Sequence, residues 1–452
     1  METEVLFVFL LFSTFAVLLF TGYPVALVLG GVGILFAVLG EYLPDLIGYE
    51  PDANLRFVGF VTNRVFDTLS SYSLIPMAMF IFMGYMLDRS GIGDRLLAAM
   101  RLALGRAPGG LALSVVIIGV VLAASTGIVG ASVVLLATIA LPPMYQAGYD
   151  KRFSLGTVGA TGCLGILIPP SIMLVVMGEQ LQIPVGDLFM AAVFPGLLLA
   201  ALYAAYIIVF ALLKPKSAPP LSAEARRSAF EGSMLLEMGK ALIAPLALIM
   251  AVLGSIFMGI ASPTEASGVG AGGAALLAFM ARKLDWKTLK EVCYLTGKTT
   301  AFLYALIFGA SCFSVILRGY GGDEVIAEAL HSLPLPPTGV LLVVLAIVFL
   351  LGFVLDWMEI VLIVAPLVVP IVVNMGFDPV WVAMLLAVCL QTSFLTPPVG
   401  TALFYLKSAA PAGTTVTDIY RGIVPFVLLQ LFGLFLVWIF PAIALWLPKA
   451  AY

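Results

Sequence analysis

Long apolar stretches, separated by short polar segments, recur from one end of the chain to the other. Each stretch is long enough to cross the roughly 30 Å of bilayer hydrocarbon as a helix that rises about 1.5 Å per residue. We therefore expect spanning helices at 4–20, 24–40, 72–88, 188–213, 241–260, 264–281, 298–317 and 423–447. Between them we expect two hairpins, at 110–145 and 338–373, and two broken spans, at 154–182 and 379–407.

Composition agrees with this pattern. Of the 452 residues, 62% are hydrophobic and only 10% are charged, and the mean hydropathy of +1.15 lies far outside the range of soluble globular domains. The opening segment has no basic n-region and no clear cleavage site, so we expect it to remain as the first helix. The predicted fold class is an all-α polytopic membrane protein without a large soluble domain.

The cysteines and the histidine exclude several kinds of chemistry. The four cysteines are isolated and form neither a CxxC motif nor a paired spacing, so neither a disulfide framework nor a zinc site is indicated. His331 is the only histidine and is expected in a loop, which argues against an HExxH metalloprotease and a histidine-dependent triad. We expect no organic cofactor and no nucleic-acid partner.

A pair of prolines relates the two halves of the chain. Pro169–Pro170 recur 228 positions later as Pro397–Pro398, and at the same offset IALPPMYQAGYD (139–150) aligns without gaps with LVVPIVVNMGFD (367–378). Several matches at one offset indicate an internal repeat. The predicted units are 1–213, a polar cytoplasmic linker at 214–240, and 241–452.

The positive charges predict the orientation of these units. If both hairpins enter and leave on the same side of the membrane, 18 of the 22 Lys and Arg residues lie on one side. The positive-inside rule makes that side cytoplasmic and places both termini outside. Each half then has an odd number of crossings, so the second half is inverted relative to the first. Inverted repeats with broken helices are typical of secondary transporters.

The breaks expected at GILIPPS (165–171) and FLTPPVG (394–400) place unpaired backbone inside the bilayer. Proline removes an amide donor and frees carbonyl oxygens, and such backbone is tolerated at membrane depth only where protein or water covers it. Freed carbonyls and half-helix C-termini suit a desolvated Na⁺, whereas half-helix N-termini suit a carboxylate. A simple kink without a ligand remains the alternative for both proline pairs.

We expect the two hairpin tips to face these breaks. The first tip, AASTGIVGAS (123–132), offers hydroxyls and glycines, and the second, LDWMEIV (355–361), has two carboxylates in an apolar run. Because a carboxylate inside the membrane is costly, Asp356 is the leading candidate for a cation ligand. Alternatively, Asp356 pairs with a basic group and Glu359 lies in the outer water. The hydroxyls of Ser125, Ser132 and Thr392 have an alternative too, as ordinary interhelical hydrogen bonds.

At four motifs the chain resembles the large membrane (M, DctM-like) subunit of tripartite ATP-independent periplasmic (TRAP) transporters, within a broader ion-transporter superfamily. The motifs are TGYPVALVLGG (21–31), ASTGIVGAS (124–132), GILIPPS (165–171) and TSFLTPPVG (392–400). The resemblance covers essentially the whole chain. It implies two inverted-topology repeats that work as an elevator, each with three helices, a re-entrant hairpin, a broken helix and a final helix.

The resemblance also implies a function and partners. The chain would import a small organic acid with Na⁺ across a bacterial or archaeal inner membrane. A periplasmic substrate-binding (P) subunit would deliver the ligand, and a small four-helix membrane (Q) subunit on a separate chain would support the scaffold.

Site residues are carried over from the same motifs. One Na⁺ site would lie at the first tip and break, with Ser125, Gly127, Gly130, Gly165, Pro169 and Pro170. The other would lie at the second tip and break, with Asp356, Thr392, Ser393, Thr396, Pro397 and Gly400. Substrate contacts are expected at Ser125, Thr126, Ser171 and Thr401.

Other functions stay open at this point. A stand-alone divalent-anion:sodium symporter would use the same tips and breaks but would need no binding protein. A channel would need a polar helix face or a ring-forming motif, and the chain shows neither. An intramembrane enzyme would need a nucleophile and base pair, and none is recognisable.

Overall fold

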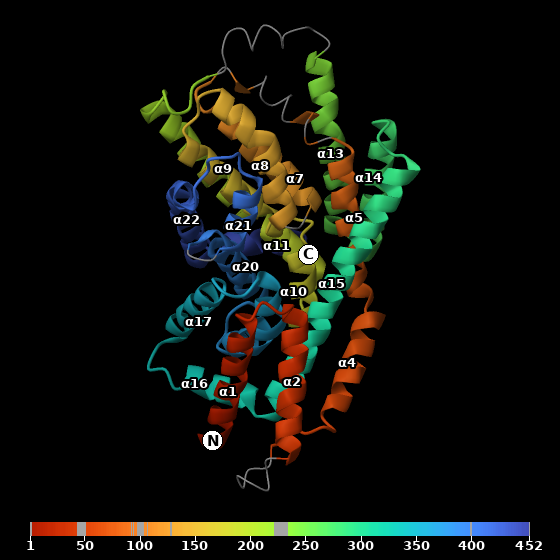
Figure 1. Ribbon diagram of the computed structural model, residues 1–452, viewed down its shortest axis with the longest axis vertical. Helices are drawn as coiled ribbons and strands as arrows, with labels where there is room; N and C mark the ends of the chain where they lie inside the picture. Colours follow the sequence, from red (N-terminus) through yellow and green to blue (C-terminus); the bar gives the residue numbers. More distant parts are fainter. Residues whose placement is uncertain are drawn as a thin grey trace.

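The computed structural model describes residues 2–42, 51–91, 93, 95–96, 104–105, 107–126, 129–220, 234–397 and 400–451. For residues 2, 123–126 and 234–242, only the backbone is described. Helices are the only regular secondary structure in this part of the chain, which confirms the predicted all-α fold (Figure 1).

Nine α-helices are described in the first half, with short 3₁₀ turns between some of them. They are α1 (Glu2–Leu19), α2 (Val25–Tyr42), α4 (Val58–Ser70), α5 (Ile75–Arg89), α7 (Gly110–Thr126), α8 (Val129–Gln146), α9 (Lys151–Cys163), α10 (Ile172–Leu181) and α11 (Val185–Leu213). The two 3₁₀ turns are η1 (Tyr72–Leu74) and η2 (Leu164–Ile166). Helices α7 and α8 are separated by two residues and pack against each other.

The second half begins with α13 and ends with α23. Its α-helices are α13 (Met234–Phe257), α14 (Pro263–Met280), α15 (Trp286–Gly319), α16 (Gly322–His331), α17 (Pro337–Leu351), α18 (Trp357–Glu359), α19 (Ala365–Asn374), α20 (Pro379–Leu395), α21 (Thr401–Ala409), α22 (Val416–Ile439) and α23 (Ala442–Ala451). A π-helical segment, η3 (Ile360–Val364), joins α18 to α19.

Among the described residues, six helices are long and apolar enough to cross a membrane. Helices α4 and α5 make a seventh candidate if they count as one span, bent by 59°. With the composition, these helices confirm a polytopic membrane protein.

Two helix predictions were wrong in extent and one helix, α4, was missed, because helical segments with polar residues do not stand out by hydropathy. The expected 72–88 helix is preceded by α4, which carries Asn63, Arg64 and Asp67 within a helical pattern. The expected 298–317 helix begins at Trp286, where the Asp285 carboxylate accepts a hydrogen bond of 2.7 Å from the Thr288 amide. Such N-caps start helices regardless of hydropathy.

The expected 423–447 helix is two helices. Helix α22 starts earlier, at Val416, behind a reciprocal Thr415–Asp418 capping box, and ends at Ile439. Pro441 lacks the amide that would continue the helix, and α23 begins after it. His331, expected in a loop, is the last residue of α16.

Both broken helices begin at equivalent caps. Asp150 accepts a hydrogen bond of 2.9 Å from the Phe153 amide at the start of α9. Asp378 accepts one of 2.9 Å from the Val380 amide at the start of α20. An aspartate in this position satisfies amides that have no partner within the helix.

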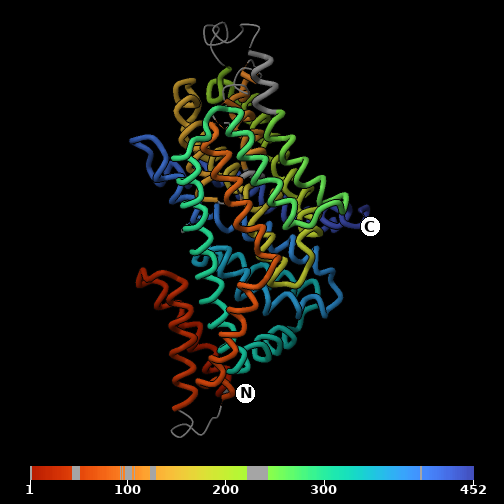
Figure 2. The backbone as a smooth tube through the Cα atoms, turned by 90° about the vertical axis from the view of Figure 1, so that its right-hand side faces the viewer, coloured from red at the N-terminus to blue at the C-terminus, as the bar shows by residue number. Residues whose placement is uncertain are grey.

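The helices form two packed groups. The peripheral group contains α1, α2, α4, α5, α13, α14, α15 and α16, in which α15 packs on α2, α4 and α5 and runs along much of the molecule (Figure 2). The central group contains α7 to α11 and α17 to α23, in which α9 packs on α7, α8 and α22. The groups meet where α5 contacts α7 and α10, and where α15 contacts η3.

The crossing of α9 and α22 brings two backbones together. A Cβ built on Gly156 would lie 2.0 Å from the Gly422 carbonyl oxygen, and one built on Gly422 would lie 2.2 Å from the Arg152 carbonyl oxygen. Only glycine fits at such distances, and small residues are what allow helices to pack closely in a membrane. A helix from each half of the chain is therefore joined at the centre of the fold.

Candidate functional site

Both broken helices leave the α-helical path at their proline pairs. In the first, α9 ends at Cys163, one 3₁₀ turn follows, and α10 begins at Ile172, after a cis Pro169–Pro170 peptide. In the second, α20 ends at Leu395 and α21 begins at Thr401. Pro398 and Val399 lie outside the described residues. Each break leaves a half-helix N-terminus, of α10 or of α21, at its far side.

The first break is enclosed by protein. Every residue from Leu164 to Ser171 is buried, including the predicted Gly165. The Ser171 hydroxyl donates a hydrogen bond to the Ile166 carbonyl, which the break has left without its helical partner. A Cβ on Gly196 of α11 would lie 2.8 Å from Ile168, so α11 closes over this break. The Ser171 oxygen still has lone pairs for another ligand.

The second break carries three hydroxyls that donate to the backbone of their own helix. Thr392 donates to the Val388 carbonyl at 2.9 Å, Ser393 to the Leu390 carbonyl at 2.8 Å, and Thr396 to the Thr392 carbonyl at 2.8 Å. Since each proton is used in this way, the hydroxyl oxygens present only lone pairs to their surroundings. Such oxygens can accept a cation but cannot donate to an anion.

The end of α17, just before the second hairpin tip, packs on the last turn of α20, just before this break. Gly352 follows α17, and a Cβ built on it would lie 2.1 Å from the Ser393 Oγ atom. Asp356, four residues further on, is the N-cap of α18. Helices α17 and α20 therefore meet just before the second tip and the second break, through Gly352 and Ser393. The contact of the tip itself with the break stays a prediction.

The two carboxylates of this tip lie in different environments. Asp356 is exposed, whereas Glu359, one helical turn further on, is only 4% exposed. The alternative of a solvated Glu359 is therefore wrong, because the start of α18 turns that side chain inward. Its Oε2 atom has no hydrogen-bond partner. Neither carboxylate forms an ion pair with a basic side chain among the described residues.

Tyr405 lies between the two hairpin tips, and the sequence did not single it out. A Cβ built on Gly130, at the start of α8, would lie 2.9 Å from the Tyr405 ring. The Tyr405 hydroxyl also lies within electrostatic range of Asp356. The signal in the sequence was its spacing, since Tyr405 follows Thr401 by four residues and so shares its face of α21.

Not every predicted site residue can be placed. Gly127 lies outside the described residues, and Ser125 and Thr126 are described only as the backbone end of α7. Ser132 is buried on α8. Gly400 is the N-cap of α21, and Thr401 is its half-buried first residue. Pro397, next to the break, is also half-buried.

The donor atoms at the second tip and break are all oxygens. In the described part of the chain, no three His, Cys, Asp or Glu side chains gather as metal ligands. One exposed carboxylate with neutral hydroxyl and carbonyl oxygens suits a hard cation and does not suit a transition metal.

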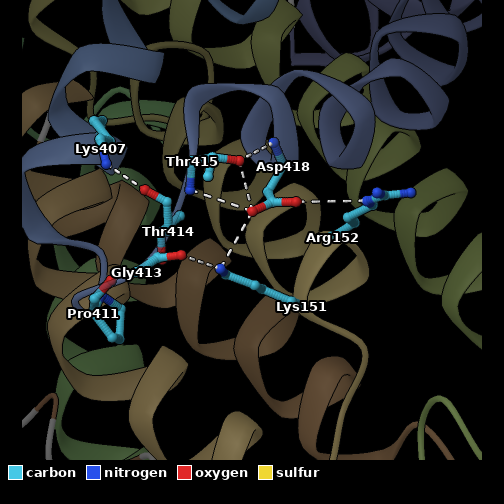
Figure 3. Close-up of polar contacts among 8 residues, drawn as sticks. All are labelled: Lys151, Arg152, Lys407, Pro411, Gly413, Thr414, Thr415 and Asp418. Atoms are coloured by element: carbon cyan, nitrogen blue, oxygen red, sulfur yellow. Dashed lines mark hydrogen bonds and ion pairs between the residues drawn. The ribbon is translucent and has the colours of Figure 1, made fainter.

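A charged cluster at the start of α9 holds the two halves together away from the breaks. The Lys151 Nζ atom lies 3.2 Å from the Asp418 Oδ2 atom and donates to the Gly413 carbonyl at 2.5 Å. The Arg152 Nε atom lies 3.7 Å from the Asp418 Oδ1 atom (Figure 3). These contacts tie the first broken helix to α22 and to the loop before it, so they are structural.

Comparison with known proteins identifies the family. The family model "Tripartite ATP-independent periplasmic transporter, DctM component" matches residues 12–443. This chain belongs to the DctM family. The family was predicted from the four motifs, and that prediction is confirmed.

Relatives with assigned functions are transport permeases and not enzymes. The chain is 33% identical over 404 residues to a C4-dicarboxylate TRAP transporter large permease, DctM, of Pseudomonas aeruginosa, covering 89% of this chain and 91% of that protein. It is 29% identical over 436 residues to an isethionate TRAP transporter permease, DctMQ, of Oleidesulfovibrio alaskensis, covering 96% of this chain and 65% of that longer protein.

The solved structure of the Alcanivorax borkumensis YdaH transporter has a similar fold. It covers 91% of this chain and 98% of its own, with a TM-score of 0.66 and 14% identity. At this identity the likeness concerns the fold alone. Together, the family and the apolar helices make this chain a multi-pass TRAP-type large permease.

Proposed function

We propose that this permease imports a small organic acid together with Na⁺. One observation carries the proposal: the exposed Asp356 lies four residues after Gly352, which packs on Ser393 in the last turn of α20, where the hydroxyls present only lone pairs. A carboxylate and neutral oxygens beside freed backbone carbonyls form a suitable environment for a desolvated monovalent cation. The Na⁺ ligands would come from Asp356, Ser393 and the backbone of Thr396, Pro397 and Gly400.

The substrate is proposed to be a small carboxylate. Half-helix N-termini carry partial positive charge, and α10 and α21 each present one at a break. Ser171 and Thr401 lie at these N-termini and are the proposed substrate contacts. The P. aeruginosa and O. alaskensis relatives are named for a C4-dicarboxylate and for isethionate, which are both small anions.

Two protein partners are proposed. The family description names a periplasmic transporter of three parts, and the name of the DctMQ relative joins an M and a Q component in a protein longer than this chain. We propose a small membrane subunit beside the peripheral helices and a periplasmic binding protein that delivers the substrate.

The transport movement is proposed to be an elevator within a bacterial inner membrane, with both termini on the periplasmic side. In this proposal the central group of helices moves against the peripheral group. The packing supports it, since the central group contains both hairpins and both broken helices, and α9 and α22 are closely joined within it. The two halves would be inverted repeats, each supplying one hairpin and one broken helix.

The proposal is tested by uptake into proteoliposomes. The permease is reconstituted with the small subunit, and the binding protein is supplied with a radiolabelled ligand that thermal-shift screening has identified. We expect uptake to need both an inward Na⁺ gradient and the binding protein. Replacing Na⁺ by choline at equal ionic strength controls for membrane potential and salt.

The two parts of the proposal can fail separately. Uptake that continues in choline would contradict Na⁺ coupling. Na⁺-driven uptake of the free ligand without the binding protein would contradict the three-part transporter and would favour a stand-alone symporter.

A further inference from the structure

Three polar side chains meet in the interior of the central group. They are Tyr203 on α11, Gln391 on α20 and Gln430 on α22, and each is fully buried at 0% exposure. Helices α11, α20 and α22 contact one another in pairs. Cys163, the last residue of α9, lies within electrostatic range of Tyr203. We call Tyr203, Gln391 and Gln430 the polar node.

The polar node is not satisfied by the protein itself. The Tyr203 hydroxyl lies in polar contact range of both glutamines, yet it has no hydrogen-bond partner of good geometry. The side-chain amide nitrogen and oxygen of Gln391 and of Gln430 also have no hydrogen-bond partner of good geometry. A buried polar group without a partner is unfavourable because it has given up its hydrogen bonds to water, and this node contains five such atoms.

The donors and acceptors of the polar node decide what it can bind. Each glutamine carboxamide offers two N–H donors and an acceptor oxygen, and the tyrosine hydroxyl can both donate and accept a hydrogen bond. A cation would leave the amide donors unpaired, and an anion would leave the carbonyl oxygens unpaired. Water both donates and accepts, and buried waters typically make about three hydrogen bonds to such groups.

We propose that the polar node holds ordered water inside the membrane-spanning core. Gln391 directly precedes Thr392, and Cys163 directly precedes the first break, so the node lies where the first arms of both broken helices end. Hydrogen bonds through this water join α20 to α11 and α22. The hydrated node therefore fixes the position of the arm that carries Thr392 and Ser393.

The proposal does not depend on the transported substrate or ion, and it is tested on the full chain in lipid nanodiscs. X-ray radiolysis produces hydroxyl radicals from bound water, and mass spectrometry then measures the modification of each tyrosine. Tyr320 is the matched control, because it is equally buried at 0% exposure but donates to the Phe36 carbonyl at 2.8 Å.

We expect Tyr203 to be modified at least about fivefold faster than Tyr320, since only Tyr203 has adjacent ordered water. In H₂¹⁸O, the oxygen added to Tyr203 carries the heavy isotope once the bound water has exchanged. Modification of Tyr203 at the same rate as Tyr320 would overturn the proposal and would mean that the three side chains bond directly to one another.

Leucine substitutions give a second readout. In Gln391→Leu combined with Gln430→Leu, the polar node loses its amides, so we expect Tyr203 modification to fall to the rate of Tyr320. Persistence of the wild-type rate in this variant would contradict a water held by the glutamines. Should the double variant fail to fold, the wild-type comparison of the two tyrosines still decides the proposal.

Discussion

The two broken helices share a backbone plan but differ in their surroundings. Each starts at an aspartate cap and breaks at a proline pair. The first break is buried throughout, and its Ser171 hydroxyl donates a hydrogen bond to the Ile166 carbonyl within the same break. The second is partly open at Thr396 and Pro397 and is faced by a tip with two carboxylates. At the 228-residue offset, Asp356 and Glu359 correspond to Ile128 and Ala131, so the first tip has no equivalent charges.

This difference shows that the residues that end the helices are not the residues that determine what each break can bind. The prolines and caps, which recur in both halves, decide where the helices end. The side chains of the facing hairpin, which do not recur, decide what the break can bind. The second tip and break therefore hold the stronger candidate for the ion site, and the first break supplies Ser171 as one of the two proposed substrate contacts. Substitutions in the two regions should differ accordingly.

The largest effect is expected from Asp356→Asn. Removing a charged ligand costs about 1.5–3 kcal/mol, and 1.4 kcal/mol corresponds to a tenfold change in affinity. The Na⁺ concentration for half-maximal uptake should therefore rise at least about tenfold, as measured in proteoliposomes. Asp323→Asn is the matched control, because Asp323 is an aspartate in a surface ion pair with Arg318. Equal Na⁺ activation in both variants would remove Asp356 from the site.

A smaller effect, on stability, is expected from Gly352→Ala. The added Cβ would lie 2.1 Å from the Ser393 Oγ atom and would push the end of α17 away from α20. Overpacking of this kind costs about 1–3 kcal/mol, so thermal unfolding of the purified protein should occur several degrees lower. Gly268→Ala on α14 is the control, since a Cβ there meets no atom within 4 Å. An unchanged melting temperature for Gly352→Ala would show that the end of α17 does not pack on Ser393 of α20.

The smallest effect is expected at the first break, from Ser171→Ala. The variant loses one hydrogen bond to the Ile166 carbonyl, a net change of about 1 kcal/mol. Uptake should keep its Na⁺ dependence, and its rate should fall by less than about fivefold. A rise in the Na⁺ concentration for half-maximal uptake as large as that of Asp356→Asn would mean that the first break is an equal partner in ion binding.

The sequence predicted those features that depend on hydropathy, proline and local caps. The polytopic all-α fold and the family follow from apolar stretches and short motifs, and both are confirmed. Helix ends with polar residues, such as the start of α15 at Trp286, were missed, because hydropathy does not register a helix that extends beyond the membrane.

Contacts between distant segments could not be predicted from local patterns. Tyr405 lies between Gly130 and Asp356 because α21 packs on α8, and its spacing from Thr401 indicates a shared helix face but not this contact. Gln391 and Gln430 are separated by 39 positions and come from different helices, so local sequence patterns could not predict the polar node either. The burial of Glu359 depends on how α18 starts after the tip, which hydropathy does not resolve.

The effect of Na⁺ on thermal unfolding tests most directly whether the second tip and break bind the ion. A ligand that binds the folded state stabilises it in proportion to the logarithm of its concentration. In nanodiscs without substrate, NaCl should raise the melting temperature of the wild-type protein and of Asp323→Asn above the value in choline chloride. Asp356→Asn should lose most of that increase. The same Na⁺-dependent increase in Asp356→Asn as in the wild-type protein would contradict the account.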